Sequence, residues 1–408
     1  MSDLPTVKVS ECCDILDNLR IPLNAEEREK IKGNIPYCGA NGIQGYISEY
    51  IFDEDLILLA EDGGNFDEYQ TRPIAYRISG KSWVNNHAHV LRSKEGYDFS
   101  FVFYSLQHKN LIPFIKGGTR AKLNQAELRE ITIWDAPLPI QQRIGEIIET
   151  IDNQIDATQA LIDKYTAIKQ GMMADLFSRG IDPETKALRP TFEEAPELYH
   201  KTPLGMLPEG WVCAPIKKFV QSAEYGISTS LNDDSSGIPV LRMNNIQNNR
   251  FNVEDLKFTK DPEAYRLKLS AGDVLYNRTN SMEHVGKTAI WRGELSECSF
   301  ASYLVRIIVN KCELLPEYFS FWMSQESSQN ALRAFATPAV QQVNINPTNL
   351  QRVLMSCPVS LLEQREIVDR IDAADAVLLR EREVLLKLNA QKSGLMQDLL
   401  TGKVPVPA

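Results

Sequence analysis

The sequence has few cysteines and no long apolar run. Its seven cysteines are scattered, and none forms a C-x-x-C pair. This pattern argues against a disulfide framework or a cysteine zinc site and predicts free thiols in a reducing compartment. No apolar stretch approaches the roughly 18 residues of a membrane span, and the first residues do not have the shape of a signal peptide. We therefore expect a cytoplasmic protein that does not enter a membrane.

Motifs of catalytic and cofactor sites are also missing. The chain contains no G-x-G-x-x-G, P-loop or H-E-x-x-H sequence and no Asn/Asp-Pro-Pro-aromatic tetrapeptide of adenine methyltransferases. His87 and His89 could be read as a metal pair, but no Cys or carboxylate stands nearby at ligand spacing, so a structural role is favoured. Glu61–Gly64 could hold a cation, although a solvated turn is the simpler interpretation. We predict a chain without a catalytic site, metal or cofactor of its own.

The charge balance, taken alone, argues weakly against nucleic acid as a partner. The formal net charge is −10. Residues 1–138 carry 15 Lys and Arg against 20 Asp and Glu, whereas residues 211–360 carry 15 against 14. The excess acid therefore lies mainly outside residues 211–360. A basic face remains compatible with this total, because the field at a surface depends on how the charges are distributed.

One stretch of the chain occurs twice. When Gln141–Leu176 is moved forward along the chain it lands without a gap on Gln364–Leu399. A fixed offset held over this length indicates an internal repeat. The residues of the first copy that meet an identical residue are Gln141, Ile144, Ile148, Asp152, Lys164, Ala167, Lys169, Gly171, Met173, Asp175 and Leu176.

Both copies have the spacing of a coiled-coil helix, in which seam residues alternate four and three positions apart. No proline interrupts either copy, and each helix would be about 50–55 Å long. The alternative is two amphipathic helices in separate cores, but core helices usually run only about 8–20 residues. Thr158, Lys169, Glu381 and Lys392 are polar seam positions, which fix register. The other seam positions are Ile144, Ile148, Ile151, Ile155, Ile162 and Tyr165 in the first copy and Ile367, Ile371, Leu378, Leu385 and Leu388 in the second.

The chain reads as a globular segment followed by a long helix, twice. We expect globular segments at 1–138 and 211–360, helices at 139–180 and 361–402, and a linker at 181–210. The second globular segment repeats the order of the first with little sequence in common. The linker is rich in proline, glycine and charge, so we expect it to cross the surface with turns and to add no core element. The predicted fold class is α+β, with two globular α/β domains and two long helices in a pseudo-twofold repeat.

Polar loops in both globular segments offer chemistry for nucleic acid. Arg and Lys pair with guanine O6 and N7, Asn and Gln pair with adenine N6 and N7, and Lys, Thr and backbone amides hold phosphates. Ordinary surface loops would explain any single one of these, but the same placement in both segments favours binding. The candidates are Tyr37, Asn41, Gln44, Lys116, Thr119, Arg120, Lys122 and Asn124 in the first segment, and Arg242, Asn244, Asn245, Arg278, Thr279, Asn280, Lys287, Gln341, Gln342, Asn344 and Asn346 in the second.

With these motifs the chain resembles the specificity subunits of type I restriction–modification systems. The strongest carriers are Gln141-Gln-Arg-Ile-Gly-Glu-Ile-Ile and Glu363-Gln-Arg-Glu-Ile-Val, which open the two helices, each of which ends in Lys-x-Gly-x-Met-x-Asp-Leu. The segments Gly205–Trp211, Pro36–Gly42 and Gly272–Arg278 are typical of target-recognition domains in this family. The resemblance covers essentially the whole chain.

The resemblance implies a non-catalytic DNA-recognition subunit. Each globular segment would be a target-recognition domain that reads one half of a split sequence in double-stranded DNA. The two helices would form an antiparallel coiled coil and act as a ruler. Two modification subunits would dock on them, bring S-adenosylmethionine and methylate adenine N6, and a restriction subunit with motor and nuclease activity could join. The alternative is a coiled-coil scaffold with two protein-binding modules, which would need no basic surface.

Overall fold

The computed structural model describes residues 4–116, 121–339 and 342–407. Within these ranges no helix combines the length and the apolar character that a membrane crossing needs. The candidate residues Thr119, Arg120 and Gln341 lie outside the described part of the chain.

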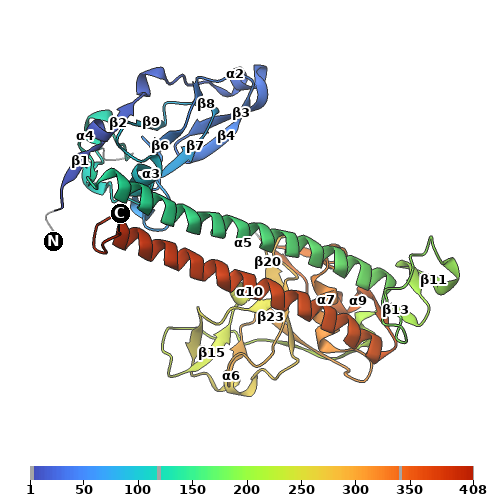
Figure 1. Ribbon diagram of the computed structural model, residues 1–408. Coiled ribbons are helices and arrows are strands. Elements are labelled where there is room, and N and C mark those ends of the chain that lie inside the picture. Colours follow the sequence, from blue (N-terminus) through green and yellow to red (C-terminus); the bar gives the residue numbers. More distant parts are fainter. Residues whose placement is uncertain (1–3, 117–120, 340–341, 408) are drawn as a thin grey trace. The chain divides into compact units, whose positions relative to one another are not determined.

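The chain forms two compact units that share two long helices. Unit 1 comprises Met1–Leu161 and Glu381–Ala408, and unit 2 comprises Ile162–Arg380. The helices are α5 (Leu138–Arg179) and α10 (Leu361–Leu399), which run uninterrupted for 42 and 39 residues (Figure 1). Each unit therefore contains the beginning or end of both helices.

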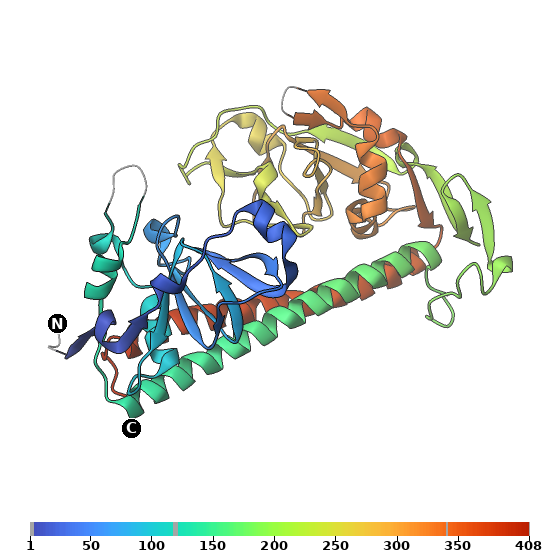
Figure 2. The ribbon, with the colours of Figure 1, turned by 90° about the horizontal axis from the view of Figure 1, so that it is seen from above.

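Unit 1 is built on two small sheets (Figure 2). Its strands are β1 (Thr6–Lys8), β2 (Cys13–Ile15), β3 (Lys32–Gly39), β4 (Gly42–Ile47), β5 (Phe52–Asp53), β6 (Leu56–Ala60), β7 (Ala75–Ile78), β8 (Lys81–Val84), β9 (Ala88–Ser93) and β10 (Thr132–Trp134), and its short helices are α1 (Val9–Cys12), α2 (Ala25–Lys30), α3 (Phe99–Gln107) and α4 (Gln125–Glu130). One sheet has the order β2-β9-β6-β7 and is antiparallel throughout. The other has the order β4-β3-β8-β5 and includes one parallel pair, β3 with β8. The separate pair β1–β10 leads into α5.

Unit 2 repeats this topology although its sequence differs. Its main elements are β13 (Trp211–Pro215), β14 (Val220–Tyr225), β15 (Ile238–Leu241), β16 (Ile246–Gln247), β17 (Arg250–Phe251), β18 (Lys257–Thr259), α6 (Pro262–Arg266), β19 (Val274–Asn277), β20 (Thr279–Asn280), β21 (Thr288–Ile290), β22 (Ser299–Phe300), β23 (Leu304–Val309), α7 (Pro316–Ser324), α8 (Glu326–Arg333), β24 (Thr337–Ala339), β25 (Gln342–Asn344), α9 (Pro347–Arg352) and β26 (Leu354–Pro358). The order β14-β23-β19-β21 corresponds to β2-β9-β6-β7, and β18-β15-β22 corresponds to β4-β3-β8, with β15 and β22 again parallel. The pair β13–β26 corresponds to β1–β10 and leads into α10.

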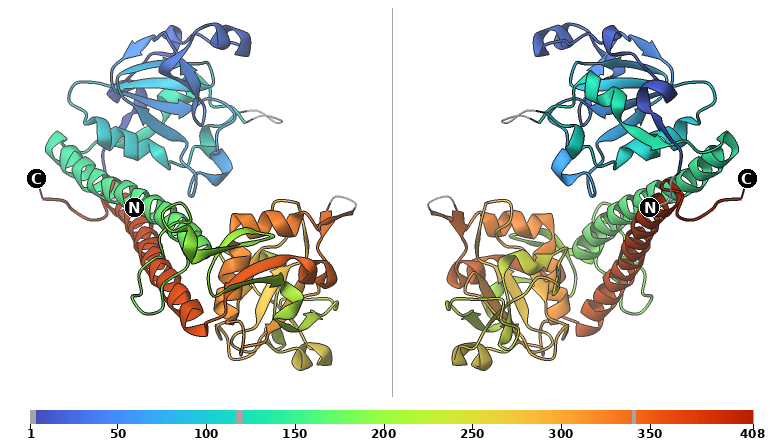
Figure 3. Two further views of the ribbon diagram at one scale, coloured as in Figure 1. Left: turned by 90° about the vertical axis from the view of Figure 1, so that its right-hand side faces the viewer. Right: turned by 90° about the vertical axis from the view of Figure 1, so that its left-hand side faces the viewer.

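In each unit a short apolar helix lies between a sheet and the long helices. In unit 1 the buried residues of α3, such as Phe101, share one core with Ile57 of β6 and Ile144 of α5. In unit 2, Tyr318 of α7 shares a core with strand and α10 residues in the same way. Figure 3 shows the short helices of unit 2, in orange, beside the long helices. The long helices are therefore part of each core, and the predicted fold class with its internal repeat is confirmed.

Two lysine–aspartate pairs join the long helices in antiparallel fashion. In unit 2, Lys169 Nζ of α5 lies 2.5 Å from Asp375 Oδ1 of α10. In unit 1, Lys392 Nζ of α10 lies 2.6 Å from Asp152 Oδ1 of α5. These four residues are equivalent in the repeat, since Lys169 corresponds to Lys392 and Asp152 to Asp375. Pairing the end of one helix with the start of the other requires an antiparallel arrangement within each unit.

The same repeat fixes each short helix to its long helix. The side-chain amide of Gln141 accepts a hydrogen bond from Asp98 N, at the start of α3, and donates to the Ala136 carbonyl oxygen. Its repeat equivalent Gln364 accepts from Leu315 N, at the start of α7, and donates to the Pro358 carbonyl oxygen. Both glutamines are buried. The two glutamines are therefore identical because each makes the same contact between a short helix and a long helix, α3 with α5 and α7 with α10.

The predicted seam residues all lie on the covered face of the helices. Ile168 and Leu386, which the seam spacing leaves out, are 52% and 71% exposed. Within the described residues, the long helices thus keep exposed apolar side chains outside the seam. The buried seam residues are Ile144, Ile148, Ile162, Ile367, Ile371 and Leu378, and the half-buried ones are Ile151, Ile155, Tyr165, Leu385 and Leu388.

The expectation that residues 181–210 add no core element is wrong. They contain a hairpin of β11 (Tyr199–Thr202) and β12 (Gly205–Pro208). Ile181 and Leu207 are buried in the core of unit 2. Ile181 N also donates to Glu363 Oε1, which accepts from Trp211 Nε1 as well. The proline and glycine content marked the turns, but it did not reveal the apolar residues that pack between them.

Because Lys169 and Asp375 are each only 14% exposed in their side chains, breaking this pair should destabilise unit 2. We expect Lys169→Met to lower the urea midpoint of the full chain, at a cost of about 1–3 kcal/mol, since it leaves a largely buried carboxylate unpaired. The double variant Lys169→Met with Asp375→Leu should recover part of the loss. The control is Lys164→Met, an exposed lysine on the same helix. Equal midpoints for Lys169→Met and Lys164→Met would contradict this role.

Candidate nucleic-acid interface

Each unit carries a hairpin-like stem just before a short helix. In unit 1 the backbones of Lys116 and Lys122 pair, with N–O distances of 3.0 and 3.2 Å, ahead of α4. In unit 2, β24 and β25 pair ahead of α9. Asn124 and Asn346 stand at the equivalent N-cap position, directly before the two helices. The two predicted polar loops are therefore the same structural feature built twice.

A second loop supports each stem from the end of a sheet strand. In unit 1, Leu123 N donates to the Glu61 carbonyl oxygen at 2.8 Å, just after β6. In unit 2, Ile345 N donates to the Arg278 carbonyl oxygen at 2.9 Å, just after β19. Glu61 and Arg278 thus occupy the same position in the repeated fold. The residue beside the stem is therefore an anion in unit 1, Glu61, and a cation in unit 2, Arg278.

The structure brings most of the unit 2 candidates together. Asn344 Nδ2 lies 2.9 Å from Thr279 Oγ1, because β25 pairs with β20. Asn280 Nδ2 lies 3.7 Å from Met243 Sδ, which places Arg242–Asn245 beside these strands. The Arg278 guanidinium stacks 4.9 Å from the ring centre of Tyr225. Asn244, Lys287 and Gln342 are exposed, Arg242, Arg278, Asn280, Asn344 and Asn346 are half-buried, and Asn245 and Thr279 are buried.

Two of the unit 2 amides already serve the backbone. Asn245, which is 2% exposed, accepts from Arg242 N and donates to the carbonyl oxygens of Asn252 and Asp255. Asn346 Oδ1 accepts from Asn349 N and so caps α9. Satisfied amides of this kind hold loop shape, and their side chains have less capacity to read a base.

The unit 1 candidates lie around the other stem, with one exception. Asn41 Nδ2 donates to the Gly63 carbonyl oxygen, and Gln44 Oε1 accepts from Asn85 Nδ2, so both side chains lie at the loops that follow the strands. Asn41, Gln44, Lys116 and Lys122 are exposed and Asn124 is half-buried. Tyr37, however, is only 2% exposed, and its hydroxyl bonds to the backbone of Leu23. Its side chain is a core residue and does not reach this surface.

The two described lysines of the unit 1 stem are already paired with carboxylates. Lys122 Nζ lies 3.0 Å from Glu61 Oε1, and Lys116 is paired with Glu127. Burial alone would raise the pKa of the Glu61 carboxyl, but hydrogen bonds from Arg20 and Lys122 hold that pKa below its usual value. By contrast, Arg278 and Lys287 have no carboxylate partner among the described residues of unit 2. The charge available to a phosphate is therefore unequal between the two units.

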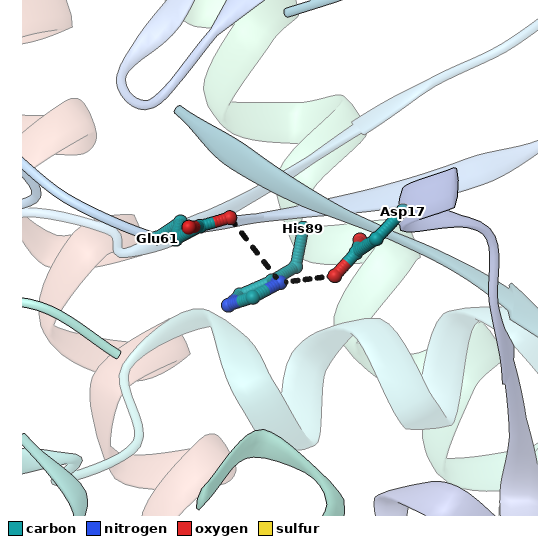
Figure 4. A group of neighbouring side chains, drawn as sticks. All are labelled: Asp17, Glu61 and His89. Carbon is teal, nitrogen blue, oxygen red and sulfur yellow. Dashed lines mark hydrogen bonds and ion pairs between the residues drawn. The ribbon is translucent and has the colours of Figure 1, made fainter. Parts of the chain in front are cut away.

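Asp17, Glu61 and His89 form a group with ligand atoms within 4.8 Å of one another (Figure 4). His89 Nδ1 lies 2.6 Å from Asp17 Oδ2 and 3.8 Å from Glu61 Oε2. His89 Nε2 lies 2.8 Å from the Leu123 carbonyl oxygen. Since both ring nitrogens face oxygen acceptors, hydrogen bonding at both requires the doubly protonated ring, which is a cation.

The partners of this group argue against a metal. Arg20 Nη1 lies 2.7 Å from Glu61 Oε2, and Gln125 Nε2 donates to Asp17 Oδ2 at 3.0 Å. Burial would raise the pKa of the Asp17 carboxyl, but the hydrogen bond from His89 leaves it below the usual value. A metal ion would have to displace donors that already balance both carboxylates, so the donor set does not fit one. The expectation that Glu61 lies in a solvated turn is wrong, since its side chain is 13% exposed.

The same group instead fastens the unit 1 stem to the sheets. Its members bond to Lys122 and Leu123 at the end of the stem and to Gln125 at the start of α4. The sequence did not reveal this function, because Asp17 and His89 are 72 positions apart and no spacing pattern links them. The exposed Tyr225 and Tyr303, which lie beside Arg278, were missed for the same reason.

The chain matches the family model of the type I restriction modification DNA specificity domain over residues 1–166 and 208–389. It is 37% identical over 151 residues to the putative type I restriction enzyme specificity subunit S.HindORF215P of Haemophilus influenzae, which covers 37% of this chain and 38% of that protein. It is 27% identical over 208 residues to the putative MjaX specificity subunit of Methanocaldococcus jannaschii, which covers 50% of this chain and 49% of that protein. These two matches thus span half or less of each relative.

Two further comparisons extend over nearly the whole chain. The MjaVIII specificity subunit of Methanocaldococcus jannaschii is 24% identical over 401 residues, which cover 93% of this chain and 88% of that protein. The crystal structure of a type I restriction–modification S subunit from M. genitalium has a TM-score of 0.63 at 12% identity, over 100% of this chain and 98% of that chain. At this identity the second comparison concerns the fold alone. Because the family model covers most of both repeats, the chain belongs to the family of the type I restriction modification DNA specificity domain.

Proposed function

We propose that this chain is the DNA-recognition subunit of a type I restriction–modification enzyme. The heads at residues 1–138 and 211–360 would each read one half of a bipartite target in double-stranded DNA. The observation that carries the proposal is the duplicated stem, which is built on the same strands in both units but carries different side chains. A repeated scaffold with divergent polar loops suits two unlike half-sites. Family membership supports the same function.

In this proposal the two kinds of loop residue do different work. The cations Arg278 and Lys287 contact phosphates and position the duplex, which gives affinity without sequence information. The amides of Gln342 and Asn344 read base edges in the major groove, where adenine offers both a donor and an acceptor. In unit 1 the proposed surface includes Asn41, Gln44, Lys116, Lys122 and Asn124, together with Thr119 and Arg120. In unit 2 it also includes Arg242, Asn244, Thr279, Asn280 and Gln341.

The chain would bind its partners through the long helices and perform no chemistry itself. Two modification subunits would dock on the helix faces that carry exposed apolar residues such as Ile168 and Leu386. They would bring S-adenosylmethionine, methylate adenine N6, and allow a restriction subunit to join in the cytoplasm. The internal repeat supports two equivalent docking surfaces. The uninterrupted length of α5 and α10 would set the spacing between half-sites.

The function is tested by co-purifying the chain with its modification subunits and measuring binding to a library of duplex DNA. The expected result is enrichment of one bipartite sequence. A stable complex with no preference among DNA sequences would overturn the proposal and favour a scaffold whose two modules bind proteins. The net charge of −10 and the paired lysines of unit 1 make this comparison informative.

Gln342→Ala should relax base choice at one position of the second half-site. The side chain is exposed next to the stem of unit 2, and a bidentate amide–adenine contact contributes about 1–3 kcal/mol of discrimination. The measurement is sequencing of the methylated motif in cells that carry the variant. The first half-site should not change, and Gln391→Ala, an exposed glutamine on α10, serves as the control. An unaltered motif for Gln342→Ala would show that this side chain does not read a base.

Lys287→Gln should weaken binding to all DNA sequences by a similar factor. Loss of one phosphate contact reduces the magnitude of the slope of log K against log salt by about 0.9. The assay is fluorescence anisotropy of the assembled complex on cognate and unrelated duplexes at several salt concentrations. Lys201→Gln, an exposed lysine in the β11–β12 hairpin, should leave the slope unchanged. A change in base preference without a change in slope would contradict a phosphate contact by Lys287.

A further inference from the structure

Unit 1 contains a cavity of about 800 Å³ where the sheets meet the end of α10. Its walls come from α3 and the residues that follow it, from β10, and from the last turns of α10. This volume is in the range of small-molecule sites, which are about 300–1,000 Å³. Neither Lys116 nor Lys122 of the stem lines the cavity, and no step of the proposed DNA recognition uses it.

The internal repeat shows which residues open the cavity. α3 and α7 both have nine residues, and the amides that begin them, Asp98 N and Leu315 N, bond to the repeat-equivalent glutamines Gln141 and Gln364. In this alignment Ser105 of α3 stands where α7 has Trp322. Along the long helices Leu400 stands where Phe177 stands in the other copy.

Both larger side chains are buried in the core of unit 2. Trp322 is 5% exposed and Phe177 is 7% exposed, and they belong to one cluster of core residues. Their smaller equivalents, Ser105 and Leu400, line the cavity of unit 1. The space that these aromatic rings fill in unit 2 is therefore open in unit 1.

The polar groups of the cavity favour an anion. Lys109 lines the cavity, and its side-chain ammonium group has no carboxylate or other hydrogen-bond partner among the described residues. Its ammonium group is partly withdrawn from water, and this burial lowers its pKa. Lys392, the other lysine of the lining, is already paired with Asp152, and no Asp or Glu lines the cavity. A half-buried ammonium without a counter-ion is costly, and a bound anion would remove that cost.

The remaining lining suits a ligand with an apolar body. Ser105 Oγ is buried and has no hydrogen-bond partner within the described structure. His108 Nδ1 lies 2.6 Å from the Tyr69 carbonyl oxygen, so Nδ1 donates there and Nε2 is left as an acceptor. Trp134 and Met396 provide apolar surface on opposite elements of the wall. A compound with an acid group and an aromatic ring would match both kinds of lining.

We propose that this cavity binds a small organic anion with an aromatic body. Its acid group pairs with Lys109, and its ring packs between Trp134 and Met396. A site of this kind would be a feature of unit 1 alone, because the repeat has Trp322 at the position of Ser105. Its position at the joint between α3 and α10 would link ligand occupancy to the stability of that joint.

The first test uses phenyl phosphate as the probe with the full chain, and isothermal titration calorimetry as the measurement. Phenyl phosphate should bind more tightly than inorganic phosphate, which lacks the ring, and than phenol, which lacks the charge. Lys109→Gln should weaken the binding of phenyl phosphate at least about tenfold, because a charged hydrogen bond is lost. Lys201→Gln is the control and should not alter binding. Equal affinity for phenyl phosphate in the native chain and Lys109→Gln would overturn the proposal.

The second test fills the cavity with the residue that the chain uses in unit 2. Ser105→Trp should abolish phenyl phosphate binding, whereas Ser105→Ala should weaken it only slightly. Circular dichroism and the thermal midpoint establish that each variant is folded. If Ser105→Trp does not fold, the binding affinity of Lys109→Gln for phenyl phosphate tests the proposal instead. Undiminished binding to a folded Ser105→Trp variant would place the probe elsewhere and overturn the proposal. These outcomes do not depend on whether the chain recognises DNA, because none of the proposed DNA contacts is part of the cavity.

Discussion

The architecture depends on a lysine and an aspartate that are used twice. Lys169 and Lys392 occupy seam positions, where an unpaired ammonium would lose hydration without compensation. A parallel, in-register pairing of the two helices would bring each residue against its own repeat, lysine against lysine and aspartate against aspartate. The antiparallel pairing instead places each lysine beside an aspartate of the other helix. Charge therefore selects the direction of pairing, whereas the apolar seam residues supply most of the burial.

Around this joint the same contacts recur with different side chains. Lys392 lies over the ring of Tyr104 and Lys169 over that of Phe321. Arg77 bonds Glu149 of α5 in unit 1, and Arg292 bonds Asp372 of α10 in unit 2, each at 2.7 Å. Glu149 and Asp372 are equivalent in the repeat. The junction with the helices thus preserves chemistry, while the loops at the stems change even the sign of charge, from Glu61 to Arg278.

The sequence predicted well what local periodicity controls and predicted poorly what distant contacts control. The two helices followed from seam spacing and from the repeat, and the stems were located because their polar residues stood in the same order in both segments. Asp152 and Asp375 were visible only as repeated identities, since they lie outside the seam. Tyr37 was assigned to a binding surface because it stands in a motif, but strand β3 turns its side chain into the core. Asn245 could not be told from a base-reading amide until its backbone partners were known.

The distribution of paired charges bears on how the proposed subunit would hold DNA. Each stem lysine of unit 1 must give up a carboxylate before it contacts a phosphate, so its net contribution to affinity is smaller than that of a free lysine. The His89 group holds the described end of this stem, through the contact of His89 with the Leu123 carbonyl oxygen and of Glu61 with Lys122. In the described part of unit 2, Arg278 and Lys287 have no carboxylate partner. In the proposed complex, therefore, unit 2 would supply more of the chain's electrostatic attraction to DNA than unit 1.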